Sequence, residues 1–340
     1  MILAGDVGGT KVNLGLFSLE GGRLRLGEQA VYPSRKYEHF QDLVREFLAA
    51  QGNPAITRAA FGIAGPVRRG VGQLTNLSWR LEAPELGEDL GLGDVWLLND
   101  LEANAWGLTE LPRRDFELLN AGDPEAVGNQ AIISAGTGLG EAGLFWDGRQ
   151  HHPFACEGGH SSFAPLTPLD AELFDFLRER EGHVSWEKVL SGAGLVNIYQ
   201  FLKATKRGEE PDSLAAELAE GDAAAVISRV AGEGASTRCS QALSLFITYY
   251  GAEAGNLALK LMATGGVFIG GGIAPKILSQ LRAGHFLAAF FGQGRMRSLL
   301  QAMPVRVVLN PQTALLGAAH YAAFGPPRPS APGVYAGRPA

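Results

Sequence analysis

The spacing of apolar and polar residues predicts paired strands at the start of the chain, followed by strands that alternate with amphipathic helices. The expected strands are residues 2–7, 12–19, 24–32, 58–64, 95–98, 130–135, 142–146, 265–269 and 305–309. The expected helices are residues 37–50, 84–90, a segment from about 100, 168–181, 191–204, most of 212–262, 276–281 and 313–324. This order indicates an α/β fold with mixed sheets.

The end of the expected strand 95–98 is central to the prediction of function. The apolar run stops at Asn99 and Asp100, and a helix-favouring segment follows at once. Ligands of open α/β sheets bind at the carboxyl ends of strands, so Asp100 is a candidate general base. Asn and Asp are also favoured helix N-caps, and this stretch alone favours capping over catalysis.

Two glycine-rich turns follow apolar strands. Gly8-Gly9-Thr10-Lys11 offers N–H groups and a hydroxyl that can bind phosphate, although a plain hairpin turn explains it equally well. It is not a P-loop, in which glycine directly precedes Lys-Ser/Thr. Gly136-Thr137-Gly138-Leu139-Gly140 leads into a strand, whereas a dinucleotide fingerprint opens a helix, so a Rossmann site is excluded.

The two turns also belong to a weak internal repeat. At an offset of 128, four residues recur: Gly8, Gly15, Leu16 and Phe17 reappear as Gly136, Gly143, Leu144 and Phe145. The repeat suggests a duplicated domain, whose two turns could hold one polyphosphate from both sides. The turn-rich, charged stretch 109–125 is the expected domain boundary.

Composition limits the cellular setting and the partners. The 340 residues leave room for two domains, and a net charge of −6 without a long basic run argues against a nucleic-acid partner. Two cysteines, Cys156 and Cys239, fit a reducing cytoplasm. The amino terminus lacks a signal-peptide pattern, and apolar stretches such as 243–250 are too short to cross a bilayer. We expect a cytoplasmic protein without a membrane partner.

Three further segments carry candidate chemistry. The run from His151 to His160 contains one thiol, which disfavours zinc and favours an exposed polar loop that presents Glu157 and His160. Glu187, taken alone, is typical of a solvated acid in a first helical turn. The glycines 270–272 precede a helix and could admit a flat ligand or a phosphate.

Taken together and in order, seven segments resemble the bacterial glucokinase family, within the actin/Hsp70/hexokinase ATPase superfold. The segments are Asp6-Val7-Gly8-Gly9-Thr10, Leu98-Asn99-Asp100, Gly136-Thr137-Gly138-Leu139-Gly140, Glu157-Gly158-Gly159-His160, His183-Val184-Ser185-Trp186-Glu187, Leu190-Ser191-Gly192-Ala193-Gly194-Leu195 and Gly270-Gly271-Gly272-Ile273-Ala274-Pro275. The resemblance spans about residues 3–324.

The resemblance implies a role for each matching position. It implies a glucose-binding set of Asn99, Asp100, Glu157, His160 and Glu187, with Asp100 as base. It implies phosphate loops at Gly8, Gly9 and Thr10 and at Gly136, Thr137 and Gly138, and a nucleotide pocket that includes Gly271 and Gly272. Family members are often homodimers. Mg²⁺ is expected to bind as a complex with ATP, without direct protein ligands. Asp6 is a candidate to bind one of the waters on Mg²⁺.

The superfold implies a two-domain actin/hexokinase-like (ribonuclease H-like) α/β fold, with mixed sheets flanked by helices and an interdomain cleft. We expect a small domain at residues 1–110, completed by the carboxyl-terminal helix (about 305–324), and a large domain at 111–304. The proline-rich residues 325–340 are expected to form a flexible tail.

The resemblance implies a glycolytic sugar kinase that transfers the γ-phosphoryl group of ATP to the 6-hydroxyl of glucose, giving glucose 6-phosphate and ADP. The related ROK sugar kinases share the Asp6-x-Gly8-Gly9-Thr10-Lys11 opening but carry a cysteine-rich zinc motif, which two distant cysteines do not provide. Another hexose or an amino sugar as substrate, polyphosphate as donor, and a non-catalytic sugar sensor remain open alternatives.

Overall fold

The computed structural model describes residues 1–74 and 77–325. Residues 75–76 and, apart from Gly325, the predicted tail lie outside the described residues. Within the described part of the chain, no helix is both long and apolar enough to cross a membrane. The chain divides into two compact units: Met1–Leu111 with the segment from Gln312 onward, and Pro112–Pro311.

The first unit is built on a mixed sheet with the order β3-β2-β1-β4-β8 and a small sheet β5-β6-β7. Its strands are β1 (Ile2–Val7), β2 (Lys11–Glu20), β3 (Arg23–Pro33), β4 (Arg58–Ile63), β5 (Val67–Arg68), β6 (Val71–Gln73), β7 (Arg80–Glu82) and β8 (Asp94–Asn99). Its helices are η1 (Ser34–Lys36), α1 (Phe40–Ala50), α2 (Ala83–Leu90), α3 (Asp100–Gly107), η2 (Leu108–Glu110) and α12 (Thr313–Phe324).

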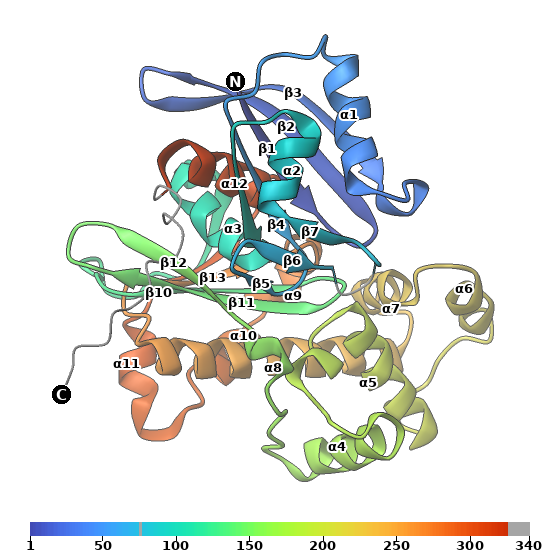
Figure 1. Ribbon diagram of the computed structural model, residues 1–340. Coiled ribbons are helices and arrows are strands. Elements are labelled where there is room, and N and C mark those ends of the chain that lie inside the picture. Colours follow the sequence, from blue (N-terminus) through green and yellow to red (C-terminus); the bar gives the residue numbers. More distant parts are fainter. Residues whose placement is uncertain (75–76, 326–340) are drawn as a thin grey trace, which may run out of the picture. The chain divides into compact units, whose positions relative to one another are not determined.

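Small residues let α12 pack very closely against α3. A Cβ atom at Gly317 would overlap the carbonyl oxygen of Ala103, and one at Gly107 would overlap the carbonyl oxygen of Thr313. Figure 1 shows the two helices side by side, although more than 200 residues separate them in the chain. The carboxyl-terminal helix therefore supports the helix that begins with Asp100.

The second unit is built on a mixed sheet with the order β12-β11-β10-β13-β14-β9. Its strands are β9 (Phe116–Asn120), β10 (Gln130–Ala135), β11 (Leu139–Trp146), β12 (His151–Cys156), β13 (Gly266–Gly270) and β14 (Val305–Val308). Its helices are η3 (Arg113–Asp115), η4 (Gly158–His160), α4 (Pro168–Glu181), η5 (Trp186–Lys188), α5 (Gly192–Ala204), α6 (Leu214–Glu220), α7 (Ala223–Gly232), α8 (Thr237–Leu261), η6 (Ala274–Ile277), α9 (Leu278–Arg282), α10 (His285–Phe290), η7 (Gly294–Met296) and α11 (Arg297–Gln301).

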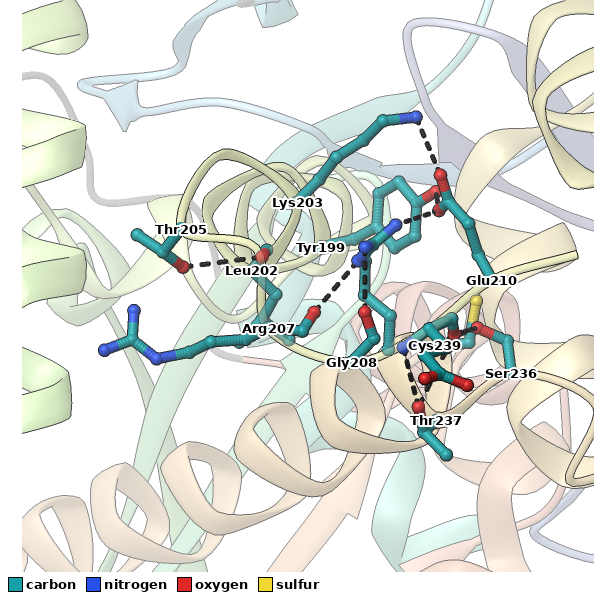
Figure 2. Close-up of polar contacts among 12 residues, drawn as sticks. Tyr199, Leu202, Lys203, Thr205, Arg207, Gly208, Glu210, Ser236, Thr237 and Cys239 are labelled. Carbon is teal, nitrogen blue, oxygen red and sulfur yellow. Dashed lines mark hydrogen bonds and ion pairs between the residues drawn. The ribbon is translucent and has the colours of Figure 1, made fainter. Parts of the chain in front are cut away.

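Helix α8 is the central element of the second unit. It is the long helix in Figure 1, and α5, α7 and α10 pack along it. A polar cluster joins the end of α5 to the start of α8: Figure 2 shows Tyr199 and Lys203 reaching Glu210. Arg238 completes the cluster, with Nη1 2.5 Å from Glu210 and Nη2 2.8 Å from the carbonyl oxygen of Gly208.

Two expectations about the elements are wrong, and a third is refined. Residues 151–156 form the edge strand β12, because they pair with β11 and do not remain a loop. The division between the two units falls between Leu111 and Pro112, inside the stretch expected as a boundary, and that stretch also contains β9, which pairs with β14. Strand β14 pairs with β13 of the second unit, so the segment that returns to the first unit starts at Gln312 and not near 305.

Candidate active site

Asn99 and Asp100 lie where β8 ends and α3 begins. Asn99 is buried, and its Oδ1 accepts hydrogen bonds from the N–H groups of Leu101 (2.9 Å) and Glu102 (3.3 Å). Its amide donates to the carbonyl oxygen of Gly65 at 3.2 Å. Asn99 is thus the N-cap, and the half-buried Asp100 is the first residue of the helix. An anion is favoured at this position because of the helix dipole.

The turn after β1 lies at the same edge of the sheet as Asp100. Strands β1, β4 and β8 are parallel, so Val7, Ile63 and Asn99 are in register at their carboxyl ends. The buried Ser34 holds the turn: its Oγ donates to the carbonyl oxygen of Gly8 (2.7 Å). Its N–H donates to the carbonyl oxygen of Thr10 (3.0 Å). The turn is therefore fixed from behind while Thr10 stays exposed.

Asp6 is the acidic group nearest to this turn in the chain. It lies in β1, in register with Asn13 of β2. Burial raises the pKa of Asp6, and the charge of Lys11 opposes that rise. Its carboxylate oxygens are of the kind that Mg²⁺ prefers as ligands, and they can also accept hydrogen bonds from water bound to Mg²⁺. Among the described residues, no group of three or more His, Cys, Asp or Glu side chains could hold a metal ion.

In the second unit, the turn 136–138 is tied to Glu187. The Leu139 N–H donates to Oε2 of Glu187 at 3.0 Å, and a Cβ at Gly138 would lie 2.5 Å from the same oxygen. The Gly136 carbonyl oxygen accepts the N–H of Gly192 at 2.9 Å, which places the turn at the start of α5. Backbone N–H groups at a helix start favour anions such as phosphate.

The segment Glu157–His160 lies beside the same turn. A Cβ at Gly159 would overlap the carbonyl oxygen of Leu139, so only glycine fits there. The N–H of Trp186 donates to the carbonyl oxygen of Ser161 at 3.0 Å, which joins the segment to η5. Glu157 and His160 are exposed, with 4.0 Å between Oε2 and Nε2. The structure thus brings Glu157, His160 and Glu187 into one neighbourhood.

The glycines after β13 meet the end of β10. Gly271 has φ +82°, and a Cβ there would overlap the carbonyl oxygen of Ala135. Both Gly271 and Gly272 are exposed. The buried Tyr250 hydroxyl lies 3.1 Å from the Ala135 nitrogen and 3.1 Å from the Gly270 oxygen. This hydroxyl therefore holds the two glycine segments in place from inside.

Sequence patterns did not reveal Ser34 or Tyr250. Each supports a glycine turn from behind, through contacts across 26 residues for Ser34 and 115 for Tyr250. Neither residue stands in a motif, so only the pairing of distant elements could identify it.

The chain matches a known protein family and has similar relatives over nearly its whole length. A family model described as glucokinase matches residues 3–324. A glucokinase from Nostoc punctiforme is 40% identical over 337 residues, which cover 95% of this chain and 99% of the relative.

Solved structures that resemble this chain are also described as glucokinases. A glucokinase from an Antarctic psychrotroph has a TM-score of 0.79 at 31% identity, over 94% of this chain and 98% of the other. A ROK-family glucokinase from Streptomyces griseus, with a TM-score of 0.63 at 23% identity over 94% of this chain and 98% of the other, shows the shared fold alone. The predicted actin/hexokinase-like α/β fold and the predicted resemblance are both confirmed. The chain belongs to the glucokinase family.

Proposed function

We propose how this chain carries out the glucokinase reaction, in which the γ-phosphoryl group of ATP passes to the 6-hydroxyl of glucose. Asp100 acts as the general base and takes the hydroxyl proton as the oxygen attacks phosphorus. The observation that carries this assignment is the division of roles at the end of β8. Asn99 already caps α3 through two N–H groups, so the carboxylate of Asp100, whose Oδ1 also accepts the N–H of Leu101 at 3.0 Å, is not required as the cap.

Sugar recognition is assigned to Asn99, Asp100, Glu157, His160 and Glu187. Carboxylates accept hydrogen bonds from neighbouring hydroxyls, and an inverted or missing hydroxyl would leave such groups unpaired. In support, Glu187 is fixed by the Leu139 N–H, which reduces the cost of ordering its side chain. The exposed pair Glu157 and His160 sits next to it on η4 and the preceding residue.

Phosphate binding is assigned to the two glycine turns, Gly8–Gly9–Thr10 and Gly136–Thr137–Gly138, with Gly271 and Gly272 next to the nucleotide. The turns supply N–H donors to phosphate oxygens, and their rigidity reduces the reorganisation required during transfer. Mg²⁺, when bound with ATP, neutralises charge on the transferred group. Asp6 would hold one of its waters.

The base assignment is tested with Asp100→Asn. We expect kcat for glucose phosphorylation to fall by about 10²-fold or more, because the amide cannot accept the proton. The free energy of unfolding in urea should change little, since Asn99 remains as the cap. Glu102→Gln, the same kind of change on the same helix, is the control and should keep kcat within a few-fold. Near-normal kcat in Asp100→Asn would refute the assignment.

We also propose Mg²⁺ dependence, a homodimer and a cytoplasmic, glycolytic setting. Removing Mg²⁺ with EDTA should abolish ADP release, and adding Mg²⁺ should restore it. Sedimentation equilibrium should give about twice the mass of 36.0 kDa. Turnover that persists in EDTA would exclude the metal requirement, and a mass of one chain at micromolar concentration would exclude the dimer.

A further inference from the structure

A buried carboxyl group lies directly beneath the proposed glucose-binding segment. Glu141 is in β11, two residues after Leu139, and is 1% exposed. A Cβ added to Gly158 would overlap Oε2 of Glu141, so this carboxyl group packs against the backbone of the glycine. The same strand therefore fixes Glu187 through Leu139 and supports Gly158 through Glu141.

A second carboxyl group faces the first from α8. Glu253 is fully buried and has a donor for each oxygen: Asn256 Nδ2 lies 2.7 Å from Oε2, and Lys260 Nζ lies 3.1 Å from Oε1. Gln293 Nε2 donates to Oδ1 of Asn256 at 3.1 Å, which leaves the Asn256 amide free to point at Glu253. Burial raises the pKa of Glu253, whereas these contacts with Asn256 and Lys260 lower it and favour the anion.

Glu141 has no comparable set of donors. Among the described residues, no N–H or O–H group lies within hydrogen-bond distance of its buried Oε1. An ionised Glu141 would be a buried, under-solvated anion beside another anion, which is strongly unfavourable. A protonated Glu141 instead has an O–H that can donate to Glu253.

The charges around Glu141 favour the same state. Burial and the neighbouring charge of Glu253 raise the pKa of Glu141 to about 8, and Lys260 opposes this. The other titratable groups coupled to it are Tyr250 of α8 and Cys156 of β12. Both are neutral near pH 7, since burial raises the pKa of each further. At pH 7 the pair therefore holds one proton.

We propose that Glu141 is a positioning residue for glucose: it shares a proton with Glu253, and the singly protonated pair supports Gly158 so that Glu157 and His160 keep their binding geometry. This inference rests on the proposed role of Glu157 and His160 in glucose binding. Ionisation of Glu141 would put a second negative charge beneath Gly158 and push the two carboxylates apart. The expected result is weaker glucose binding at alkaline pH.

The test measures KM for glucose and kcat from pH 6 to 9.5 at saturating ATP, in wild type, Glu141→Gln and Glu141→Ala. Wild-type KM should rise about fivefold between pH 8 and pH 9, the factor for a single group of pKa about 8 whose protonated form alone binds. Glu141→Gln, which keeps a donor for Glu253 and cannot ionise, should lose this rise. Glu141→Ala should have a raised KM throughout, with kcat changed less.

Glu233→Gln is the matched control, because the side chain of Glu233 is exposed on the second unit and paired with Arg229. It should keep the wild-type pH profile. Superimposable profiles for wild type and Glu141→Gln would overturn the proposal, provided that wild type phosphorylates glucose.

A second readout does not require activity. Infrared difference spectra between wild type and Glu141→Gln at pH 7 should contain the carbonyl stretch of a protonated carboxylic acid, and it should vanish at pH 9.5. Its absence at pH 7 would refute the shared proton. A wild type that has this band but does not phosphorylate glucose would count against the proposed function alone.

Discussion

At the scale of single residues, neighbouring side chains can have separate tasks. The Oδ1 of Asn99 accepts hydrogen bonds from two N–H groups of α3, and its amide donates one to the carbonyl oxygen of Gly65. Capping and catalysis therefore need not compete for Asp100. The sequence predicted that one of the two residues caps the helix, but the choice depends on which side chain turns back over the first helical turn. That depends on the position of Gly65, 34 residues away.

Gly138 provides a prediction at this scale. Gly138→Ala would place a methyl group 2.5 Å from Oε2 of Glu187, so the carboxylate must move and its bond to Leu139 must lengthen. We expect KM for glucose to rise about tenfold, corresponding to about 1.4 kcal/mol of lost binding. Steady-state kinetics at saturating ATP measure this.

Gly27→Ala is the control for this change, since its Cβ would meet nothing closer than 3.6 Å. It should leave KM for glucose unaltered. An unchanged KM in Gly138→Ala would show that Glu187 is not held in place through this contact.

At the scale of elements, the hairpins were predictable and their partners were not. Alternating apolar residues and glycine turns indicated the strands of β1, β2, β10 and β11. Strand β12 was missed because His151, His152 and Glu157 make this stretch look polar, although an edge strand needs few apolar residues. The support of the first turn by Ser34 depends on the register of β2 with β3, in which Lys11 lies opposite Pro33.

Ser34→Ala tests this support. The change removes the donor to the Gly8 carbonyl oxygen inside a buried site, and leaving that oxygen unpaired should destabilise the protein by about 1–3 kcal/mol. We expect KM for ATP to rise more than KM for glucose, because the loosened turn is assigned to phosphate. Urea unfolding and separate titrations of ATP and glucose measure the two effects.

Ser18→Ala changes the same side chain on the same sheet at an exposed contact with Glu20, and should alter neither quantity. Equal rises in the two KM values for Ser34→Ala would argue that the turn does not serve phosphate selectively.

At the scale of the whole molecule, each unit repeats one strand order. Two hairpins are followed by two parallel strands, β4 and β8 in one unit and β13 and β14 in the other. In the second strand of the hairpin, the residues that match at offset 128 lie one position away from the residues that are equivalent in the two structures. Val7 and Val12 enclose four residues, whereas Ala135 and Leu139 enclose three. The match at offset 128 therefore identified the duplicated hairpin without giving its register.

The polar cluster of the second unit makes the free energy of unfolding depend on pH. Burial acts to raise the pKa of Glu210, but hydrogen bonds from Tyr199, Lys203 and Arg238 outweigh it and lower the pKa to about 2. The stabilisation is thus present above the ordinary pKa of 4.5 and is lost as pH falls toward 2. Glu210→Gln should destabilise the protein by about 3 kcal/mol at pH 7, because Arg238 loses its partner.

Urea unfolding at pH 7, 4 and 2.5 measures this difference, which should shrink as the pH falls. Glu217→Gln, at an exposed ion pair with Arg229, should cost much less. A Glu210→Gln deficit that stays constant with pH would show that packing, not charge, holds the cluster.

The tight contact between α3 and α12 has a consequence for biosynthesis. A ribosome makes the helix that starts with Asp100 more than 200 residues before the helix that packs against Ala103 and Gly107. Domains generally fold as units during synthesis, but this unit has an incomplete core until residues 313–324 leave the exit tunnel. Until then the nascent chain should expose the apolar side of its first sheet, which makes it a natural client for chaperones that bind such surfaces.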